Sequence, residues 1–336
     1  MFLRILFILT VFVVALASCA PAAPTSAPTS APQAGATATR VPLTPTGKGS
    51  LRIGVLPITD VVPFYIADAQ GYFKQQGLTV ELVPVSSAAE RDQLMATQQI
   101  DGELNDLVST VLFNAQSPKI KIVRKARQAF PNSAEYWILT AKDSAIKTAQ
   151  DLKGKEIAIS QNSVIEYVTQ RLLEKEGLSA ADIKTTNVPS IPTRLQILQQ
   201  NQIAAATLPD PLASLALLQG ARIVVDDTKY PDYSISVISF RVDIVAQRAD
   251  DVRKFLAAYD QSINDIRTKP DQFRNVLIDK SRVPDQLKDK YQFPPFPDPS
   301  IPSQAQWDDV VKWAMDKKLI TAPVTFDSSV DSGFVK

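Results

Sequence analysis

The side chains best suited to chemistry in this sequence are aromatic, amide and carboxylate groups that follow runs of β-forming residues. In open α/β sheets ligands bind beside the carboxyl ends of the strands, so these loops are expected to meet at one edge. Stacking faces with a rim of neutral or acidic groups suit a flat, uncharged heteroaromatic ring that bears hydroxyls. The candidate ligand-binding residues are Asp60, Phe64, Tyr65, Asn105, Asp106, Tyr136, Trp137, Gln161, Asn162, Tyr167 and Asp210.

Each candidate also has a structural explanation. Asp106, Asn162 and the neighbouring Ser163 are residue types that commonly cap helices. Phe64 and Trp137 are equally consistent with positions in a hydrophobic core. Ligand binding is favoured because five separate loops place polar or aromatic groups at the same predicted edge.

The charges of these loops argue against an anionic ligand. A sulfonate, nitrate or phosphate site would use Arg, Lys or a glycine-rich turn that directs several amides at one anion. None of the candidate loops contains Arg or Lys, and the 11 glycines of the chain form no glycine-rich phosphate loop. The sequence therefore predicts a binding site without cations.

The composition of the chain excludes most catalytic chemistry. The 336 residues include no histidine and one cysteine, which rules out Ser-His-Asp triads, Cys-His dyads, zinc sites with histidine ligands and an intramolecular disulfide. A formal charge of +1 gives no electrostatic signature for nucleic acid, and 45% hydrophobic residues allow a substantial core. We expect a protein of two lobes that is not an enzyme and has no metal, cofactor or nucleic-acid partner.

The first 50 residues have the pattern of an export signal and a tether. Met1–Arg4 is positively charged, and Ile5–Leu16 is an uncharged run of about 12 residues, the length of a signal-peptide core rather than of a membrane span. The residues up to Cys19 resemble a bacterial lipobox, which implies cleavage before Cys19 and lipidation of its sulfur. The alternative is an ordinary signal peptide with a cysteine at its cleavage site. Residues 20–49 are almost entirely Ala, Pro, Thr and Ser, a composition that cannot bury enough apolar surface to fold. We therefore expect a signal peptide at 1–18 and a lipidated tether at 19–50.

From Leu51 onward, short β-rich runs alternate with helical patterns in two successive units. This βαβ succession predicts an α/β fold with two lobes and largely parallel sheets. Two apolar runs, 136–141 and 234–240, are expected to be hinge strands between the lobes. The predicted lobes are 51–138 with 239–336, and 139–238. The predicted strands are 51–56, 78–83, 101–104, 120–123, 156–160, 183–188, 203–208 and 222–225, and the predicted helices are 63–69, 88–98, 107–115, 164–175, 193–200, 211–219, 252–267 and 307–319.

Several short motifs follow one another in a recognisable order. They are Val62–Ala67, Gln70–Leu82, Gln99–Gly102, Asp151–Lys155, Glu174–Leu178, Leu208–Pro211 and Val252–Tyr259. In order and spacing they resemble the substrate-binding proteins of ABC importers in the SsuA/THI5-like (NMT1) group. The resemblance implies a two-lobed periplasmic-binding-protein fold of type 2, with two hinge strands and a small ligand in the cleft between the lobes. It also implies delivery of the ligand to a membrane permease and its ATPase, from a protein that is lipid-anchored on the outer face of the cell membrane and contacts the membrane only through that anchor.

The candidate residues lead to an expected ligand within this group. An aromatic set without cations most resembles the riboflavin-binding (RibY-type) members, with a pyrimidine precursor of thiamine as the second choice and a sulfonate such as taurine as the third. A ligand-sensing domain for a membrane partner is an alternative of a different class. The enzymes of the group that make the thiamine pyrimidine use a histidine as substrate, and this chain has none.

Overall fold

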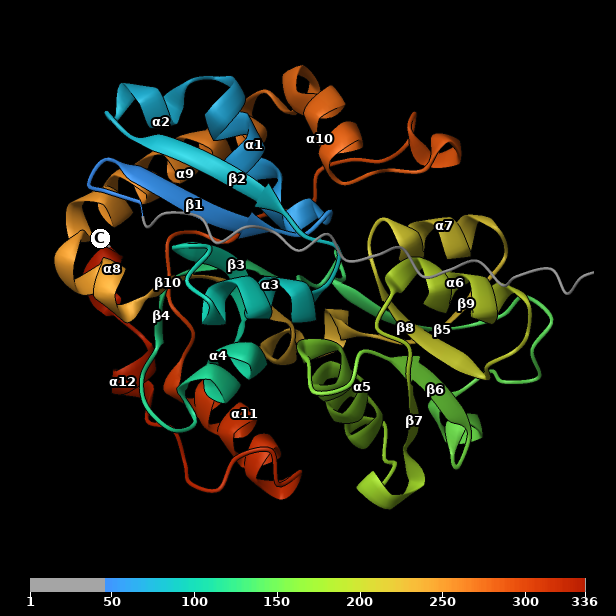
Figure 1. Cartoon of the computed structure of the whole chain (residues 1–336). Helices are drawn as coiled ribbons and strands as arrows, with labels where there is room; N and C mark the ends of the chain where they lie inside the picture. Colours follow the sequence, from blue (N-terminus) through green and yellow to red (C-terminus); the bar gives the residue numbers. More distant parts are fainter. Residues whose placement is uncertain (1–45, 336) are drawn as a thin grey trace, which may run out of the picture. The chain divides into compact units, whose positions relative to one another are not determined.

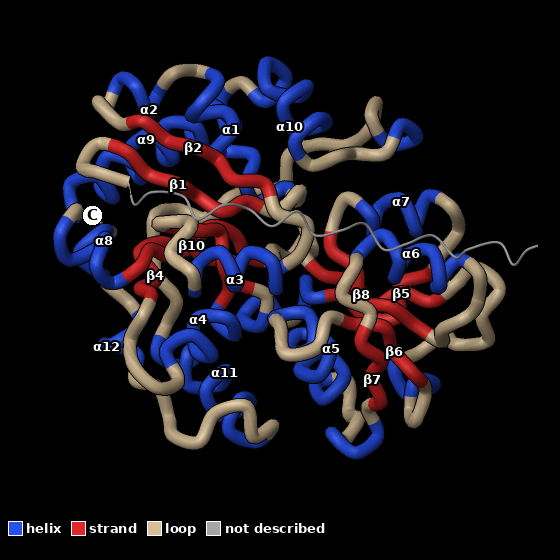
Figure 2. Tube along the Cα trace, viewed as in Figure 1, coloured by secondary structure: helices blue, strands red, loops and turns tan. Residues whose placement is uncertain are grey.

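Two five-stranded sheets form the framework of residues 46–335, which are the residues that the computed structural model describes (Figures 1 and 2). These residues belong to one compact unit, Leu43–Lys336. The predicted signal peptide, the lipidation of Cys19 and nearly all of the predicted tether lie outside the described residues. Within residues 46–335, no helix is long and apolar enough to cross a membrane.

Sheet 1 has the strand order β2-β1-β3-β10-β4. Strand β1 pairs in parallel with β2 and β3, and β10 runs antiparallel to both β3 and β4. Four strands therefore point one way and β10 points the other way. The strands are β1 (Ser50–Val55), β2 (Thr79–Pro84), β3 (Gly102–Asp106), β4 (Ile120–Gln128) and β10 (Ile235–Arg241).

Sheet 2 repeats this plan with the strand order β7-β6-β8-β5-β9. Strand β6 pairs in parallel with β7 and β8, whereas β5 runs antiparallel to β8 and β9. The prediction of an α/β fold is confirmed, and each largely parallel sheet contains one antiparallel strand. The strands are β5 (Tyr136–Thr140), β6 (Glu156–Ile159), β7 (Lys184–Asn187), β8 (Ala205–Pro209) and β9 (Arg222–Asp226). We call sheet 1 with its covering helices lobe 1, and sheet 2 with its covering helices lobe 2.

Helices cover both faces of each sheet (Figure 1). In lobe 1, α1 and α9 pack on one face through a core that includes Leu51, Ile53 and Phe255, and α3 and α4 cover the other face. In lobe 2, α5 covers one face, and α6 and α7 cover the other. The helices are α1 (Val62–Ala69), α2 (Tyr72–Gln75), α3 (Ala88–Ala96), α4 (Leu107–Asn114), α5 (Val164–Lys175), α6 (Ile191–Gln199), α7 (Leu212–Leu218), α8 (Val242–Gln247), α9 (Ala249–Thr268), α10 (Arg274–Lys280), α11 (Gln304–Asp316) and α12 (Phe326–Ser329).

The chain crosses between the sheets at residues 129–135 and 227–234. The two runs expected to be hinge strands are instead the antiparallel members of single sheets, β5 in sheet 2 and β10 in sheet 1. The carboxylate of Asp227, on the second crossing, accepts hydrogen bonds from the backbone amides of Glu135 (2.9 Å) and Tyr136 (3.0 Å). This buried carboxylate therefore joins the two crossings. The lobe boundaries given above stay a prediction.

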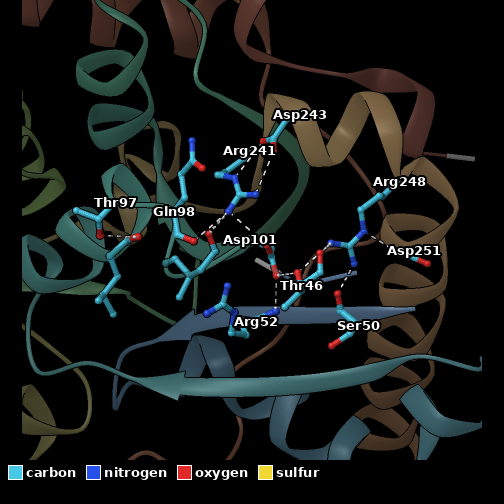
Figure 3. Close-up of polar contacts among 12 residues, drawn as sticks. Thr46, Ser50, Arg52, Thr97, Gln98, Asp101, Arg241, Asp243, Arg248 and Asp251 are labelled. Atoms are coloured by element: carbon cyan, nitrogen blue, oxygen red, sulfur yellow. Dashed lines mark hydrogen bonds and ion pairs between the residues drawn. The ribbon is translucent and has the colours of Figure 1, made fainter. Parts of the chain in front are cut away.

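A polar network fixes the start of the described chain to lobe 1 (Figure 3). Buried Asp101 accepts a hydrogen bond from the Thr46 hydroxyl (2.6 Å) and forms a salt bridge with Arg241 (3.3 Å). Arg248 donates to the Thr46 hydroxyl (2.9 Å) and pairs with Asp251 (3.0 Å). These contacts lie at the amino-terminal end of β1, which is the end opposite to the loops that carry the candidate residues.

Candidate functional site

A small cavity lies between the lobes, at the carboxyl ends of the parallel strands of both sheets. Its volume is about 80 Å³, which corresponds to two or three water molecules at about 30 Å³ each. Both lobes contribute to its wall, as expected for a ligand that the lobes enclose. From lobe 1 it is lined by Leu56, Ile58, Asp60, Ser86, Ser87, Ala88, Arg91, Leu104, Asn105, Asp106 and Ser236, and from lobe 2 by Tyr136, Ser160, Ser163, Val164, Ile165, Pro189, Ile191, Arg194 and Pro209.

Arg194 is the most unusual residue of this cleft. It lies on α6, whose first turn is capped by Ser190, and its side chain is 0% exposed. Its Nη1 donates to the Thr207 carbonyl (2.9 Å), but Nε and Nη2 have no hydrogen-bond partner among residues 46–335. The guanidinium also forms no salt bridge within the described chain. Arg194 is therefore a buried positive charge in the cleft lining, with two donors that no described residue uses.

Burial is the main influence on the charge of Arg194. It lowers the pKa of the guanidinium to about 10, so the group remains cationic at neutral pH. A buried ion without a counter-charge is expensive, because it loses its hydration and gains no opposite charge. An anionic group bound in the cleft would supply both the charge and the acceptors that this side chain lacks.

Lobe 1 places a second arginine in the cleft wall, and this one is surrounded by acids. Arg91, on α3, lies 2.7 Å from Asp92, 3.6 Å from Glu103 and 3.7 Å from Asp106. Burial raises the pKa of Asp106, and it raises the pKa of Glu103 well above its ordinary value. Arg91 is therefore neutralised by its own neighbours, and burial favours the uncharged forms of Glu103 and Asp106.

Two further polar groups of lobe 1 face the cleft without a partner. The Oδ1 atom of Asn105 and the hydroxyl of Ser236 are buried and make no hydrogen bond with any described residue. By contrast, Asp60 is held by Arg127, which donates to Asp60 Oδ1 at 2.9 Å. Buried polar atoms are normally satisfied, so the unpaired atoms of Asn105 and Ser236 are candidates for contact with a ligand.

The structure brings together four of the eleven candidate residues. Asp60, Asn105, Asp106 and Tyr136 line the cleft. Asp106 also caps α4, because its Oδ1 accepts from the Ser109 amide at 2.8 Å, as its structural explanation predicts.

The other seven candidates lie outside the cleft lining. Phe64 is fully buried against Phe255 and Tyr259 in the core of lobe 1, and Tyr65 lies beside Lys280. Trp137 and Asp210 line a separate pocket of about 570 Å³. The remaining three are Gln161 and Asn162, which are exposed, and Tyr167, which packs on Trp313 of α11.

The expectation of a site without cations is wrong, because Arg91 and Arg194 both line the cleft. Both arginines lie one turn inside the helices that follow β2 and β7, beyond the loops that contain the candidate residues. The same rule, extended by one helical turn, would have reached them. The aromatic walls expected for riboflavin are also missing from this cleft, where Tyr136 is the one aromatic side chain in the lining.

Comparison with known proteins identifies the family of this chain. Residues 58–273 match the family model described as NMT1/THI5 like. The chain belongs to the NMT1/THI5-like family. Over 216 residues it is 22% identical to a putative thiamine biosynthesis protein of Haemophilus influenzae, which covers 63% of this chain and 67% of that protein.

One further relative and one similar solved structure are named as sulfonate-binding proteins. Over 92 residues the chain is 38% identical to a putative aliphatic sulfonates-binding protein of Escherichia coli, and the match spans 27% of this chain and 28% of that protein's length. The structure resembles the alkanesulfonate-binding protein SsuA from Xanthomonas axonopodis pv. citri bound to MOPS, with a TM-score of 0.73 and 19% identity over 86% of this chain and 100% of that chain. This likeness establishes the two-lobed periplasmic-binding-protein fold of type 2.

Proposed function

We propose that this protein is the substrate-binding component of an ABC importer and that its ligand is a small organic sulfonate. The observation that carries the proposal is Arg194, a fully buried cation in the cleft with two unused donors. A sulfonate has a permanent negative charge and three oxygen acceptors, and the planar fork of an arginine can donate to two of them. The sulfonate ligands named for the Escherichia coli relative and for the Xanthomonas protein support this ligand class.

The size and composition of the cleft favour a small ligand over riboflavin. A cavity of about 80 Å³ is much smaller than the 300–1,000 Å³ typical of sites for larger, drug-sized ligands. Tyr136 provides one aromatic face, whereas a tricyclic ring would stack between two. The thiamine-pyrimidine alternative likewise gives no role to the unpaired charge of Arg194.

The arrangement of the polar groups explains how a ligand would hold the lobes together. Arg194 comes from lobe 2, and Ser236 and Asn105 come from lobe 1. A ligand whose oxygens bind Arg194 on one side and the Ser236 hydroxyl on the other connects the two lobes across the cleft. The closed form then delivers its ligand to the membrane permease, which works with an ATPase, and the lipid on Cys19 holds the exported protein at the membrane.

A ligand panel tests this function directly. We expect isothermal titration calorimetry of the purified protein to show binding of ethanesulfonate or 2-aminoethanesulfonate with a dissociation constant below about 10 µM, near −7 kcal/mol. Riboflavin and the hydroxymethylpyrimidine precursor of thiamine serve as comparison ligands and should give no heat of binding. Binding of riboflavin in the absence of sulfonate binding would overturn the proposal.

A further inference from the structure

The first crossing between the lobes contains a buried carboxyl group without a partner. Glu135, the last residue of this crossing, is 2% exposed. Neither oxygen of its carboxyl group forms a hydrogen bond with any residue in the part of the chain that the structure describes. An ionised carboxylate in such a place loses its hydration and gains no donor in return. The surroundings of Glu135 therefore favour a proton on its carboxyl group.

The charged groups that face Glu135 strengthen this preference. Asp60 of lobe 1 and Asp227 of the second crossing are carboxyl groups that act on it, and both are buried. The cation that acts on it is Arg127 of β4, whose Nη1 already donates to Asp60 Oδ1 at 2.9 Å. Tyr136, the next residue along the chain, adds an uncharged phenol. Three buried carboxyl groups therefore share one guanidinium.

The far side of Arg127 adds no cation to this cluster. There the guanidinium faces the carboxyl group of Asp210 and the phenol of Tyr291. Asp210 accepts hydrogen bonds from the backbone amide and the hydroxyl of Ser214, so other donors hold it in place. Arg127 is thus shared with a further acid, and it cannot neutralise Glu135 as well.

The groups around Glu135 belong to parts of the chain that move relative to one another when the lobes separate. Asp60 and Arg127 belong to lobe 1, whereas Tyr136 begins β5 of lobe 2. Arg127 also donates to the Ala134 carbonyl at 3.0 Å, so lobe 1 holds the first crossing directly beside Glu135. Hinge opening changes the backbone conformation at such crossings. We therefore expect opening to admit water to Glu135 and to move it away from Asp60.

We propose that Glu135 makes lobe closure sensitive to pH: its carboxyl group is protonated in the closed form, and loss of that proton favours the open form. This inference concerns the movement of the lobes and not the identity of the ligand. Burial and then the charge of Asp60 raise the pKa of Glu135 well above its ordinary value, and the charge of Arg127 opposes the rise. Water returns the pKa toward its ordinary value in the open form. Closure therefore takes up a proton, so low pH favours the closed form and rising pH opposes it.

Small-angle X-ray scattering of the ligand-free protein tests this proposal, because separated lobes have a larger radius of gyration. We expect a larger radius at about pH 8.5 than at about pH 5.5. Glu135→Gln keeps the shape of the side chain without its charge, so its radius should be the same at both pH values. Glu81→Gln is the matched control, because Glu81 is an exposed glutamate of β2, and it should behave as the unmodified protein does. An unchanged radius in the unmodified protein, or the same pH-dependent change in Glu135→Gln, would overturn the proposal.

Proton uptake during ligand binding gives a second measurement. Ethanesulfonate has no group that titrates near neutral pH, so any proton exchanged comes from the protein. Calorimetry near neutral pH, in buffers of different ionisation enthalpy, should show uptake of about 0.5–1 proton per ligand, with a dissociation constant that rises up to about tenfold per pH unit. Binding without proton uptake by the unmodified protein would contradict the proposal.

The two measurements fail independently. If ethanesulfonate does not bind, the proposed function is wrong, and scattering from the ligand-free protein still decides whether Glu135 controls closure. If Glu135→Gln does not fold, proton uptake by the unmodified protein decides it.

Discussion

Replacing Arg194 should lower the affinity for the ligand without lowering the stability of the ligand-free protein. Its Nε and Nη2 are the two donors that a sulfonate would use, and the side chain is fully buried. Each hydrogen bond to a charged partner contributes about 1.5–3 kcal/mol, and removing one member of a buried charge pair costs about 2–5 kcal/mol. A loss of about 3 kcal/mol corresponds to a dissociation constant about 150 times larger for Arg194→Gln.

The stability of the ligand-free protein should respond differently. In that state the charge of Arg194 is uncompensated, so Arg194→Met removes a costly buried ion and loses one hydrogen bond to the Thr207 carbonyl. We expect a melting temperature at least as high as that of the unmodified protein, together with the loss of the stabilisation that a sulfonate provides. A large drop in melting temperature without ligand would show that Arg194 is a structural cation.

The assay is calorimetry with 2-aminoethanesulfonate, combined with thermal unfolding with and without the ligand. Arg194→Lys keeps the charge but loses the planar fork, so its affinity should lie between those of the unmodified protein and Arg194→Gln. Arg253→Gln is the matched control, because Arg253 is an exposed arginine paired with Asp250 on the surface of α9. Unchanged affinity in Arg194→Gln would refute the reasoning.

Two further predictions concern residues near the crossings between the lobes. Burial raises the pKa of Asp227 to about 6 from an ordinary value of 3.8. At a pH between these two values, the carboxyl of Asp227 is protonated in the folded protein and ionised in the unfolded chain. The contribution of this group to the free energy of unfolding is therefore complete below about pH 4. It decreases by about 3 kcal/mol as the pH rises through 6. Urea unfolding from pH 4 to 7 should show this fall in the unmodified protein relative to Asp227→Asn, and parallel pH profiles would contradict it. In the second prediction, Trp137→Ala leaves sulfonate affinity within about twofold because Trp137 lines another pocket, whereas Tyr136→Ala weakens it about tenfold or more. Calorimetry on both variants distinguishes the two neighbours, and a strong loss in Trp137→Ala would place the ligand elsewhere.

Local patterns in the sequence were sufficient to predict most elements of the fold. The apolar spacing of 164–175 predicts a helix with those bounds, and α5 has them because Ser163 caps its start and its buried face carries Val168 and Leu172. The run 234–240 forms an extended strand, as predicted, but its antiparallel position between β3 and β4 depends on long-range pairing. A sequence pattern of one strand contains no information about which neighbours it will pair with.

The candidate site was less accessible to sequence reasoning, for two physical reasons. An arginine on an amphipathic helix such as α6 is normally an exposed residue, and Arg194 is buried because α6 packs against β8 and α7. Aromatic side chains pack in cores as readily as they bind ligands. Tyr167 illustrates this, because its ring contacts Trp313 at a centroid distance of 5.5 Å, across more than 140 residues of sequence.

A crystal structure of the protein with 2-aminoethanesulfonate tests the central claim most directly. The account predicts sulfonate oxygens at about 2.7–3.0 Å from Arg194 Nε and Nη2, in the cleft between the two sheets. A sulfonate bound outside the cleft, or bound in the cleft away from Arg194, would contradict it.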